Sequence, residues 1–297
     1  MQVFERGWLS SNCIFFDDGH VTSLVDSGYC AHSAQTLDLV AAKLGRRSLD
    51  FLLNTHLHSD HCGGNAALQA QYPDLVTVIP PGQAELVEVW DTVGLFYTPT
   101  GQNCPQFGFD QTFQGGAAVQ LGLQSWEVHA AGGHDPHAVI LFEPTSRTLI
   151  SADALWQSGF GVIFPELEGI EAFSEVAATL DLIERLNPVA VIPGHGSIFK
   201  YTSETLATAR QKLEGFVKDP IKLARHGAKV LLKFKLLEQQ RLKFSEFSEW
   251  AANTPCLVQY QSRFFADSDF PSWVELLCFE LVKAGVAKLE DGDIFNQ

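Results

Sequence analysis

The stretch Asn54-Thr-His-Leu-His-Ser-Asp-His-Cys-Gly-Gly-Asn65 is the most informative part of the chain, because it places three imidazoles and a carboxylate within six residues. The apolar run Leu49-Asp-Phe-Leu-Leu53 predicts a short buried strand before it, and Gly63-Gly64 predict a tight turn after it. Such a turn lets four side chains project towards one point: His56, His58, Asp60 and His61. Neutral imidazoles and carboxylates are the usual ligands of zinc, iron and manganese. The pattern therefore predicts a metal site rather than a polar loop.

Three later motifs stand at the ends of further predicted strands: Gly133-His134-Asp-Pro136, Ala152-Asp153 and Pro193-Gly-His195. Together with the first motif they resemble the metallo-β-lactamase superfamily, whose members carry T-H-x-H-x-D-H, then a Gly-His turn, an Asp and a final Gly-His. The resemblance covers about residues 1–215. It implies an α/β fold, a four-layer αββα sandwich whose strand-end loops meet along one edge.

The resemblance also implies a centre with two divalent metal ions. It assigns one ion to His56, His58 and His134. It assigns the other to Asp60, His61 and His195, with Asp153 as the bridge. Zinc is the expected metal, and iron or manganese also suits these nitrogen and oxygen donors. A hydroxide held between the two ions would attack the substrate, and Asp60 and Asp153 are the candidate catalytic carboxylates.

Five further residues are candidates for supporting the ligands or contacting the substrate: Asp26, His137, Trp156, Phe160 and Phe164. Asp26 stands where the superfamily has a supporting residue beside the metals. His137 either orients a ligand, meets the substrate or packs at the surface. The three aromatic residues are expected to wall the pocket, and their alternative role is ordinary core packing.

Periodicity predicts the elements around these motifs. A hairpin is expected over residues 12–25, and a helix capped by Ser33 runs to Leu44. Another helix is expected over 83–96, before an aromatic loop over 97–110 that forms either a lid or a surface loop. The later elements are a hairpin over 138–152, an amphipathic helix over 171–186 and a strand over 189–192.

The composition changes after about residue 215, so we expect two domains. Residues 1–215 form the catalytic domain, and residues 216–297 form a small helical domain that resembles a winged-helix module, with three helices and a terminal hairpin. The second part has 11 basic and 11 acidic residues, so the net charge of −15 falls on residues 1–215. Basic residues recur at helical spacing at Lys218, Lys222, Arg225, Lys229 and Lys233. This stripe is either a solvated face or a contact for nucleic acid or phosphate.

The net charge and the cysteine spacing indicate which partners and which cellular compartment to expect. A pI near 5.0 disfavours nonspecific attraction to nucleic acid or to an anionic membrane. Neither a signal peptide nor an apolar run long enough to span a membrane is expected. Six scattered cysteines without CxxC pairs indicate reduced thiols in a cytoplasmic protein. A homodimer stays open.

The metal ligands alone do not fix the substrate, because the superfamily shares one centre across thioesters, lactones, β-lactams and phosphodiesters. We expect a small-molecule substrate, namely an ester, thioester or lactone, since aromatic walls and an acidic surface disfavour polyanions. No basic cluster of the kind that binds glutathione follows the last ligand. One alternative is a phosphodiesterase or ribonuclease that uses the C-terminal domain to contact nucleic acid. Another is a non-hydrolytic di-iron or metal-binding protein.

Overall fold

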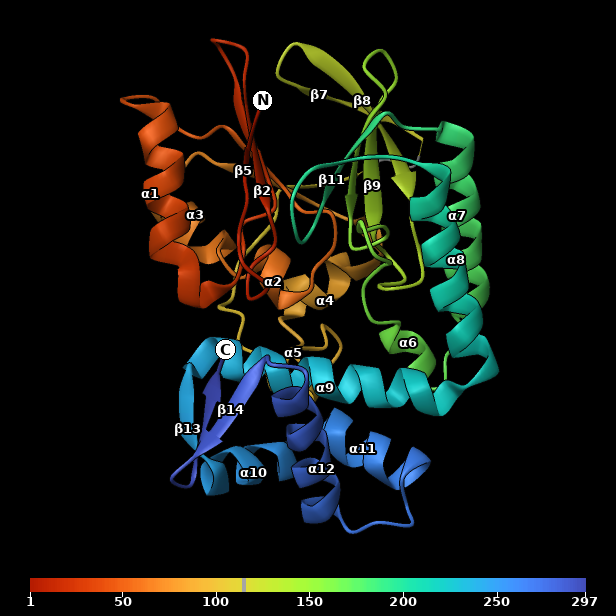
Figure 1. The fold of residues 1–297 in the computed structure, drawn as a ribbon. Coiled ribbons are helices and arrows are strands. Elements are labelled where there is room, and N and C mark those ends of the chain that lie inside the picture. The colour runs from red at the N-terminus through yellow and green to blue at the C-terminus, as the bar shows by residue number, and fades with distance from the viewer. Residues whose placement is uncertain (114–115) are drawn as a thin grey trace.

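Two six-stranded sheets lie at the centre of the protein, as a computed structural model describes it for residues 1–113 and 116–297 (Figure 1). The first sheet has the order β1 (Gln2–Phe4), β2 (Cys13–Asp17), β3 (Thr22–Val25), β4 (Phe51–Leu53), β5 (Val76–Ile79) and β6 (Gln111–Thr112). The second has the order β12 (Phe199–Lys200), β11 (Ala190–Pro193), β10 (Thr148–Ala152), β9 (Val139–Glu143), β8 (Gln124–Ala130) and β7 (Ala118–Leu121). Each sheet mixes antiparallel hairpins with parallel pairs, such as β3 with β4 and β10 with β11.

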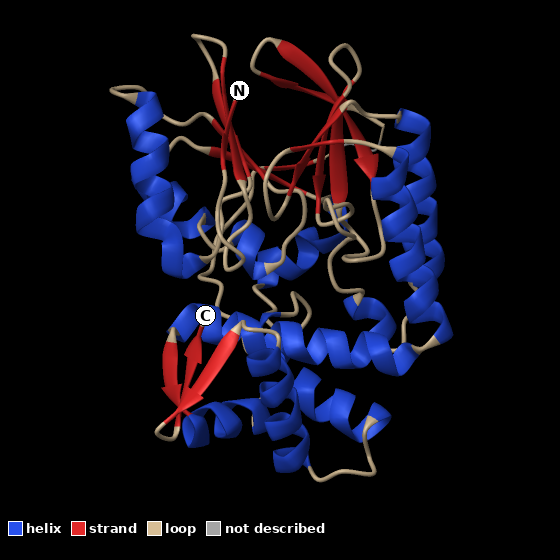
Figure 2. Cartoon of the chain, in the orientation of Figure 1, coloured by secondary structure: helices blue, strands red, loops and turns tan. Residues whose placement is uncertain are grey.

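The two sheets share one hydrophobic core. Strand side chains from the first sheet, including Phe16 and Leu53, pack with Trp126 and Leu141 from the second. Helices cover the outer faces (Figure 2): α1 (Ser33–Leu44) and α3 (Asn65–Gln71) on the first sheet, α7 (Phe173–Leu186) and α8 (Ser203–Lys218) on the second. The expected αββα sandwich is confirmed. Helix α1 ends at Gly45 as expected, but Ser33 lies inside the helix and His32 occupies the cap position.

Short helices occupy the edge of the sandwich where the strands end: α2 (Ser59–Cys62), α4 (Ala84–Val89), α5 (Tyr97–Thr100) and α6 (Phe164–Leu167). The helix expected over 83–96 is shorter, because Trp90 adopts a left-handed conformation with φ 51° and ends α4. The aromatic segment that follows contains α5, and Tyr97 and Phe107 are buried there. This segment therefore packs against the body of the protein.

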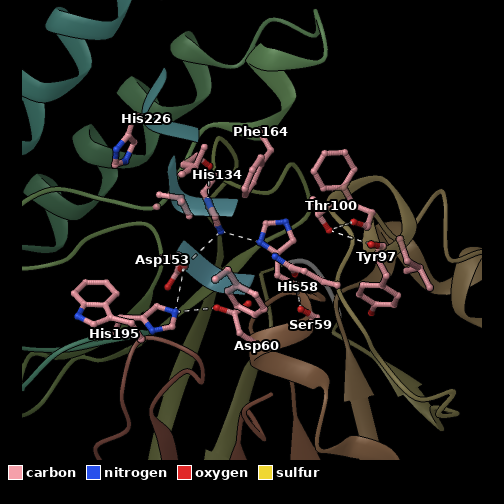
Figure 3. Close-up of a pocket in the computed structure, with 18 of the residues that line it drawn as sticks. His58, Ser59, Asp60, Tyr97, Thr100, His134, Asp153, Phe164, His195 and His226 are labelled. Carbon is pink, nitrogen blue, oxygen red and sulfur yellow. Dashed lines mark hydrogen bonds and ion pairs between the residues drawn. The ribbon is translucent and has the colours of Figure 1, made fainter. Parts of the chain in front are cut away.

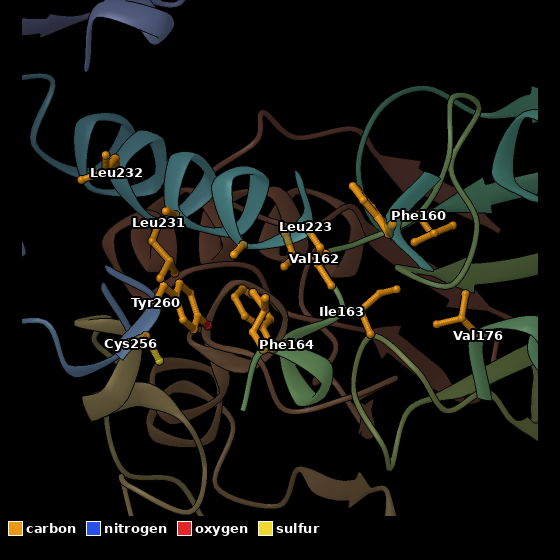
Figure 4. Close-up of a cluster of buried hydrophobic side chains, with 14 of the residues drawn as sticks. Phe160, Val162, Ile163, Phe164, Val176, Leu223, Leu231, Leu232, Cys256 and Tyr260 are labelled. Atoms are coloured by element: carbon orange, nitrogen blue, oxygen red, sulfur yellow. The ribbon is translucent and has the colours of Figure 1, made fainter. Parts of the chain in front are cut away.

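The C-terminal part lies below that same edge (Figure 1). It contains α9 (Pro220–Gln239), α10 (Phe244–Ala252), α11 (Pro255–Phe264) and α12 (Phe270–Lys283), and a sheet of β13 (Arg241–Lys243), β15 (Asp293–Asn296) and β14 (Ala287–Glu290). Helix α11 and strand β13 exceed the three helices and hairpin expected. A single hydrophobic cluster joins Ile163 and Phe164 to Leu223, Leu231 and Tyr260 (Figure 4). The division at residue 215 and the winged-helix resemblance stay predictions.

Hydropathy along the helices gives one further result. Within residues 1–113 and 116–297, no helix is both long enough and apolar enough to cross a membrane.

Candidate metal centre

The histidine-rich loop is held at the end of β4 by backbone and side-chain hydrogen bonds. His58 caps the single turn of α2, which begins at Ser59, and the carbonyl of His61 accepts a hydrogen bond from the amide of Ser27 at 2.8 Å. His134 follows β8, Asp153 follows β10 and His195 follows β11. Because these strand ends lie at one edge of the sandwich, seven side chains from distant parts of the sequence meet there.

The side chains form overlapping groups whose potential ligand atoms lie within 4.8 Å of one another. The groups are His56, His58 and His134; His56, His61 and Asp153; and Asp60, His61 and His195. The first and third groups coincide with the two ligand sets assigned from the sequence. Successive contacts connect five of these side chains in a continuous series: His58, His134, Asp153, His195 and Asp60 (Figure 3).

Asp153 lies between the groups. Its Oδ1 is 3.4 Å from His61 Nε2, and its Oδ2 is 3.4 Å from His134 Nε2. Trp156 Nε1 donates a hydrogen bond to Oδ1 at 3.2 Å. A Cβ added at Gly194 would overlap this same oxygen, so the turn before His195 is shaped to admit the carboxylate. The position suits a bridging ligand.

The histidine nitrogens fit a cation. His56 Nε2 and His61 Nε2 are buried and find no hydrogen-bond partner in the part of the chain that the structure describes. Unpartnered buried polar atoms are costly, and a metal ion would satisfy them. Burial also holds the pKa of His56 well below its usual range and lowers the pKa of His58 to about 4. Both rings are therefore neutral at pH 7, as ligation requires.

The two carboxylates are ionised. Burial alone raises the pKa of Asp60, but the hydrogen bond with His195 at 3.0 Å and the charge of His61 outweigh it and hold the pKa below its usual value. Burial likewise opposes ionisation of Asp153, yet His195 and His61 hold its pKa well below the usual range. Both side chains can accept protons or bind cations at neutral pH.

Asp26 supports the site through His61. Its Oδ2 lies 2.8 Å from His61 Nδ1, and its two oxygens accept hydrogen bonds from the amide and hydroxyl of Thr55 at 2.9 and 2.8 Å. Burial lowers the pKa of His61, but Asp26 and Asp153 together raise it well above the usual value. His61 Nδ1 therefore keeps its proton and donates it to Asp26, and Nε2 faces the cluster. The carbonyl of Val162 fixes His134 in the same way, by accepting from Nδ1 at 2.5 Å.

A cavity of about 250 Å³ opens on the cluster, and aromatic side chains form much of its wall. Trp156 and Phe164 line it as expected, together with Phe96. The expectation for Phe160 was wrong: this ring is 1% exposed, packs with Phe216 and lies beneath the ammonium group of Lys212.

His137 takes the surface position that the sequence left open as its alternative. Its amide donates to Asp135 Oδ1 at 2.7 Å, and its exposed imidazole lies against Gly82. The neighbouring Asp135 turns towards the cluster instead, with Oδ2 3.8 Å from His58 Nε2. The sequence could have indicated Asp135 as a site residue, because it directly follows the candidate ligand His134.

Three residues of the site were missed. Asn12 Nδ2 donates to the carbonyls of Pro193 and Gly196 at 2.9 and 2.7 Å, and so holds the turn of His195. Trp8 stacks on His195 with ring centroids 5.4 Å apart. His226 reaches the cavity from α9, set apart from the cluster (Figure 3). Only the tertiary fold brings Trp8 and His226 here, so no local pattern could have identified them.

The basic stripe is largely engaged within the protein. Arg225 and Lys229 both pair with Glu280, at 2.7 and 2.9 Å, and Lys233 Nζ donates to the carbonyl of Val286 at 2.6 Å. These contacts engage three of the five basic residues, and Lys218 and Lys222 are exposed.

Comparisons with known proteins agree with this geometry. The sequence model of the family described as "Metallo-beta-lactamase superfamily" matches residues 6–195. A hydroxyacylglutathione hydrolase of Brucella anthropi is 29% identical over 173 residues, which are 58% of this chain and 55% of that relative. One of Brucella ovis is 26% identical over 217 residues, which are 72% and 71%.

Among solved structures, a metallo-beta-lactamase family protein from Thermus thermophilus shares the fold. The TM-score is 0.54 at 14% identity, over 97% of this chain and 94% of that one. The chain thus spans about half the length of the Brucella anthropi relative and nearly all of the Thermus thermophilus fold.

Proposed function

This chain belongs to the metallo-beta-lactamase superfamily, and on that premise we propose that it is a metal-dependent hydrolase of a small ester, thioester or lactone, with a thioester as the leading candidate. The observation that carries the proposal is the convergence of seven candidate ligand side chains at one sheet edge, where two buried imidazole nitrogens, His56 Nε2 and His61 Nε2, are unpartnered among the described residues.

We propose that His56, His58 and His134 would hold one divalent ion and that Asp60, His61 and His195 would hold the other, with Asp153 between them. The nitrogen and oxygen donors support zinc, iron or manganese, and zinc is the default. Such ions supply Lewis acidity, which polarises a carbonyl group and makes water more acidic.

The chain's own residues would hold and position the reactants. Asp60 and Asp153 are ionised, so each can bind a cation and accept a hydrogen bond that orients the attacking water. The indole of Trp156 keeps Asp153 in place through its hydrogen bond to Oδ1. Phe96 and Phe164 exclude bulk water from the cavity, which strengthens the electrostatic interactions inside it.

The relatives and the cavity both support an acyl substrate. Proteins named hydroxyacylglutathione hydrolase act on a thioester, and an apolar wall suits an acyl group. Glutathione itself is not favoured, because Lys200 is the one basic residue between His195 and Arg210. The proposal therefore concerns the acyl part and leaves the thiol part open.

A substrate panel tests the proposal. Protein loaded with zinc or manganese is assayed on acyl thioesters, lactones, bis-p-nitrophenyl phosphate and single-stranded RNA. Turnover of a thioester, ester or lactone is expected, and Asp153→Ala is expected to lose both hydrolysis and metal. Asp267→Ala, at an exposed position far along the chain, is the matched control and is expected to keep both. Turnover of RNA far above the esters would overturn the proposal, and so would tightly bound metal without any hydrolysis.

A further inference from the structure

We infer that the metal cavity continues into an apolar groove along α9, and that this groove binds the extended acyl chain of the substrate. The inference rests on the proposed function, because the chain must be attached to a carbonyl group that reacts at the metal centre. It narrows the substrate class from small acyl compounds to acyl thioesters or esters with a long aliphatic chain.

The groove is continuous with the metal cavity. A second hollow of about 350 Å³ lies beside the first and shares four wall residues with it: Trp8, His226, Val230 and Phe234. The first hollow contains the candidate ligands Asp60, Asp153 and His195. An acyl chain that extends from the candidate metal ligands past these shared residues enters the second hollow directly.

One face of α9 forms the floor of the groove. His226, Val230, Phe234 and Leu237 follow one another at intervals of four, four and three residues, so they share one helical face. All four are half-buried. At 1.5 Å per residue the stripe is about 16 Å long, which suits a medium to long acyl chain. Leu281 and Ala284, from α12 and its C-terminal cap, form the other side with Val286.

The charged groups at the rim are held by contacts within the protein. Glu280 lies between Arg225 and Lys229, with oxygen to nitrogen distances of 2.7 and 2.9 Å. Lys233 points its ammonium group at the carbonyls of Val286 and Gln297, at 2.6 and 2.9 Å. Because each of these groups has a partner within the protein, the wall between them consists mainly of apolar side chains and suits a hydrocarbon chain.

Trp8 marks the passage between the two hollows. Its indole stacks on His195, meets the edge of Trp156 at 5.3 Å and is still 57% exposed. A large aromatic surface left open beside a candidate metal ligand gains free energy when an apolar group covers it. An acyl chain that runs from the cluster towards α9 would cover this face.

A series of thioesters with one small thiol and acyl chains from acetyl to decanoyl tests the inference in the metal-loaded protein. Because each buried methylene adds to the binding free energy, kcat/KM is expected to rise by at most about fourfold per added methylene until the groove is full. Ala284→Phe places a bulky ring on the wall of the second hollow, at an exposed position. It is expected to move the optimum to shorter chains. Val258→Phe, at a 42% exposed position on α11, is the matched control and is expected to keep the wild-type profile.

Binding gives a second readout that does not need turnover. Decanoate and hexanoate are titrated into metal-free protein while intrinsic tryptophan fluorescence is followed, to which Trp8 in the passage contributes. Decanoate is expected to bind at least about tenfold more tightly, and Ala284→Phe to reduce that preference. Equal rates and equal affinities across chain lengths, in a protein that does hydrolyse thioesters, would overturn the groove and leave the proposed function standing. Absence of hydrolysis on every ester and thioester would instead overturn the proposed function, while the titration still decides whether the groove binds a chain.

Discussion

At the scale of single residues, Asp26 shows how a carboxylate outside the candidate ligand set can orient one of the ligands, His61. Its backbone is left-handed, with φ 57°, and its oxygens bind Thr55 and His61 Nδ1. Because Nδ1 donates to Asp26, the ring must present Nε2 to the cluster. Partners of this kind orient metal-bound imidazoles and raise their basicity.

The substitution Asp26→Asn tests this role. Asparagine tolerates the left-handed backbone, but its amide donates a proton where the carboxylate accepts one, so His61 loses the partner that fixes its tautomer. We expect metal affinity to fall about 10- to 100-fold, measured by competition with a chelating dye. Asp110→Asn, which alters a carboxylate that accepts from the amide of Thr77, is the control. Unchanged affinity in Asp26→Asn would show that Asp26 does not orient the ligand.

At the scale of elements, the turns that follow β10 and β11 in the second sheet pack closely against each other. β10 and β11 pair in parallel, so Asp153 and His195 leave the sheet side by side. Ala152 adopts φ 45°, a conformation that costs a non-glycine residue about 1–2 kcal/mol. The amide of Gly194 donates to the carbonyl of Ala152 at 2.8 Å and keeps the two turns together.

The substitution Gly194→Ala tests the close packing of these two turns. The added methyl group would overlap Asp153 Oδ1 and approach His61 Cε1 to 2.9 Å, so the carboxylate must move. We expect hydrolysis to fall at least about tenfold, with metal content reduced, while the fold measured by circular dichroism persists. Gly108→Ala has open space around the new methyl group and is expected to behave like the wild type. Full activity in Gly194→Ala would contradict the proposed position of Asp153.

At the scale of the whole molecule, the C-terminal helices are part of the main core. The cluster that contains Leu149 and Val191 of the second sheet also contains Leu223 and Leu231 of α9 and Trp273 of α12. Helix α9 approaches α6 closely at Gly227, where a Cβ would meet Leu167 at 2.7 Å. We therefore propose that residues 1–215 and 216–297 unfold together, although they differ in composition.

Calorimetry tests this coupling. We expect one cooperative unfolding transition. Leu231→Ala is expected to lower the free energy of unfolding by about 2–5 kcal/mol, and the variant is still expected to unfold in a single transition. Ile221→Ala, at a 49% exposed position on the same helix, is expected to change it by less than about 0.5 kcal/mol. Two separate transitions in the wild type would contradict the shared core and favour independent domains.

The sequence predicted the sandwich and the meeting of the seven side chains because each motif directly follows an apolar strand, and strand ends gather at one edge. It could not predict Trp8 or His226, whose places depend on how a loop and a distant helix dock. Spacing could not choose between the roles of His137, because the turn sends its imidazole to Gly82 and Asp135 to the cluster. Helix α11 was missed because Thr254-Pro255 reads as a turn, whereas proline is well suited to the first turn of a helix. The roles of the seven ligands stay predictions.

The central claim is a centre of two divalent metal ions, and the metal content of the purified protein tests it most directly. The protein is purified without a metal-chelating column and analysed by plasma mass spectrometry. We predict about two equivalents of transition metal per chain, because two separate groups of three candidate ligands lie on either side of Asp153. Less than one equivalent after careful handling would contradict the two-metal account.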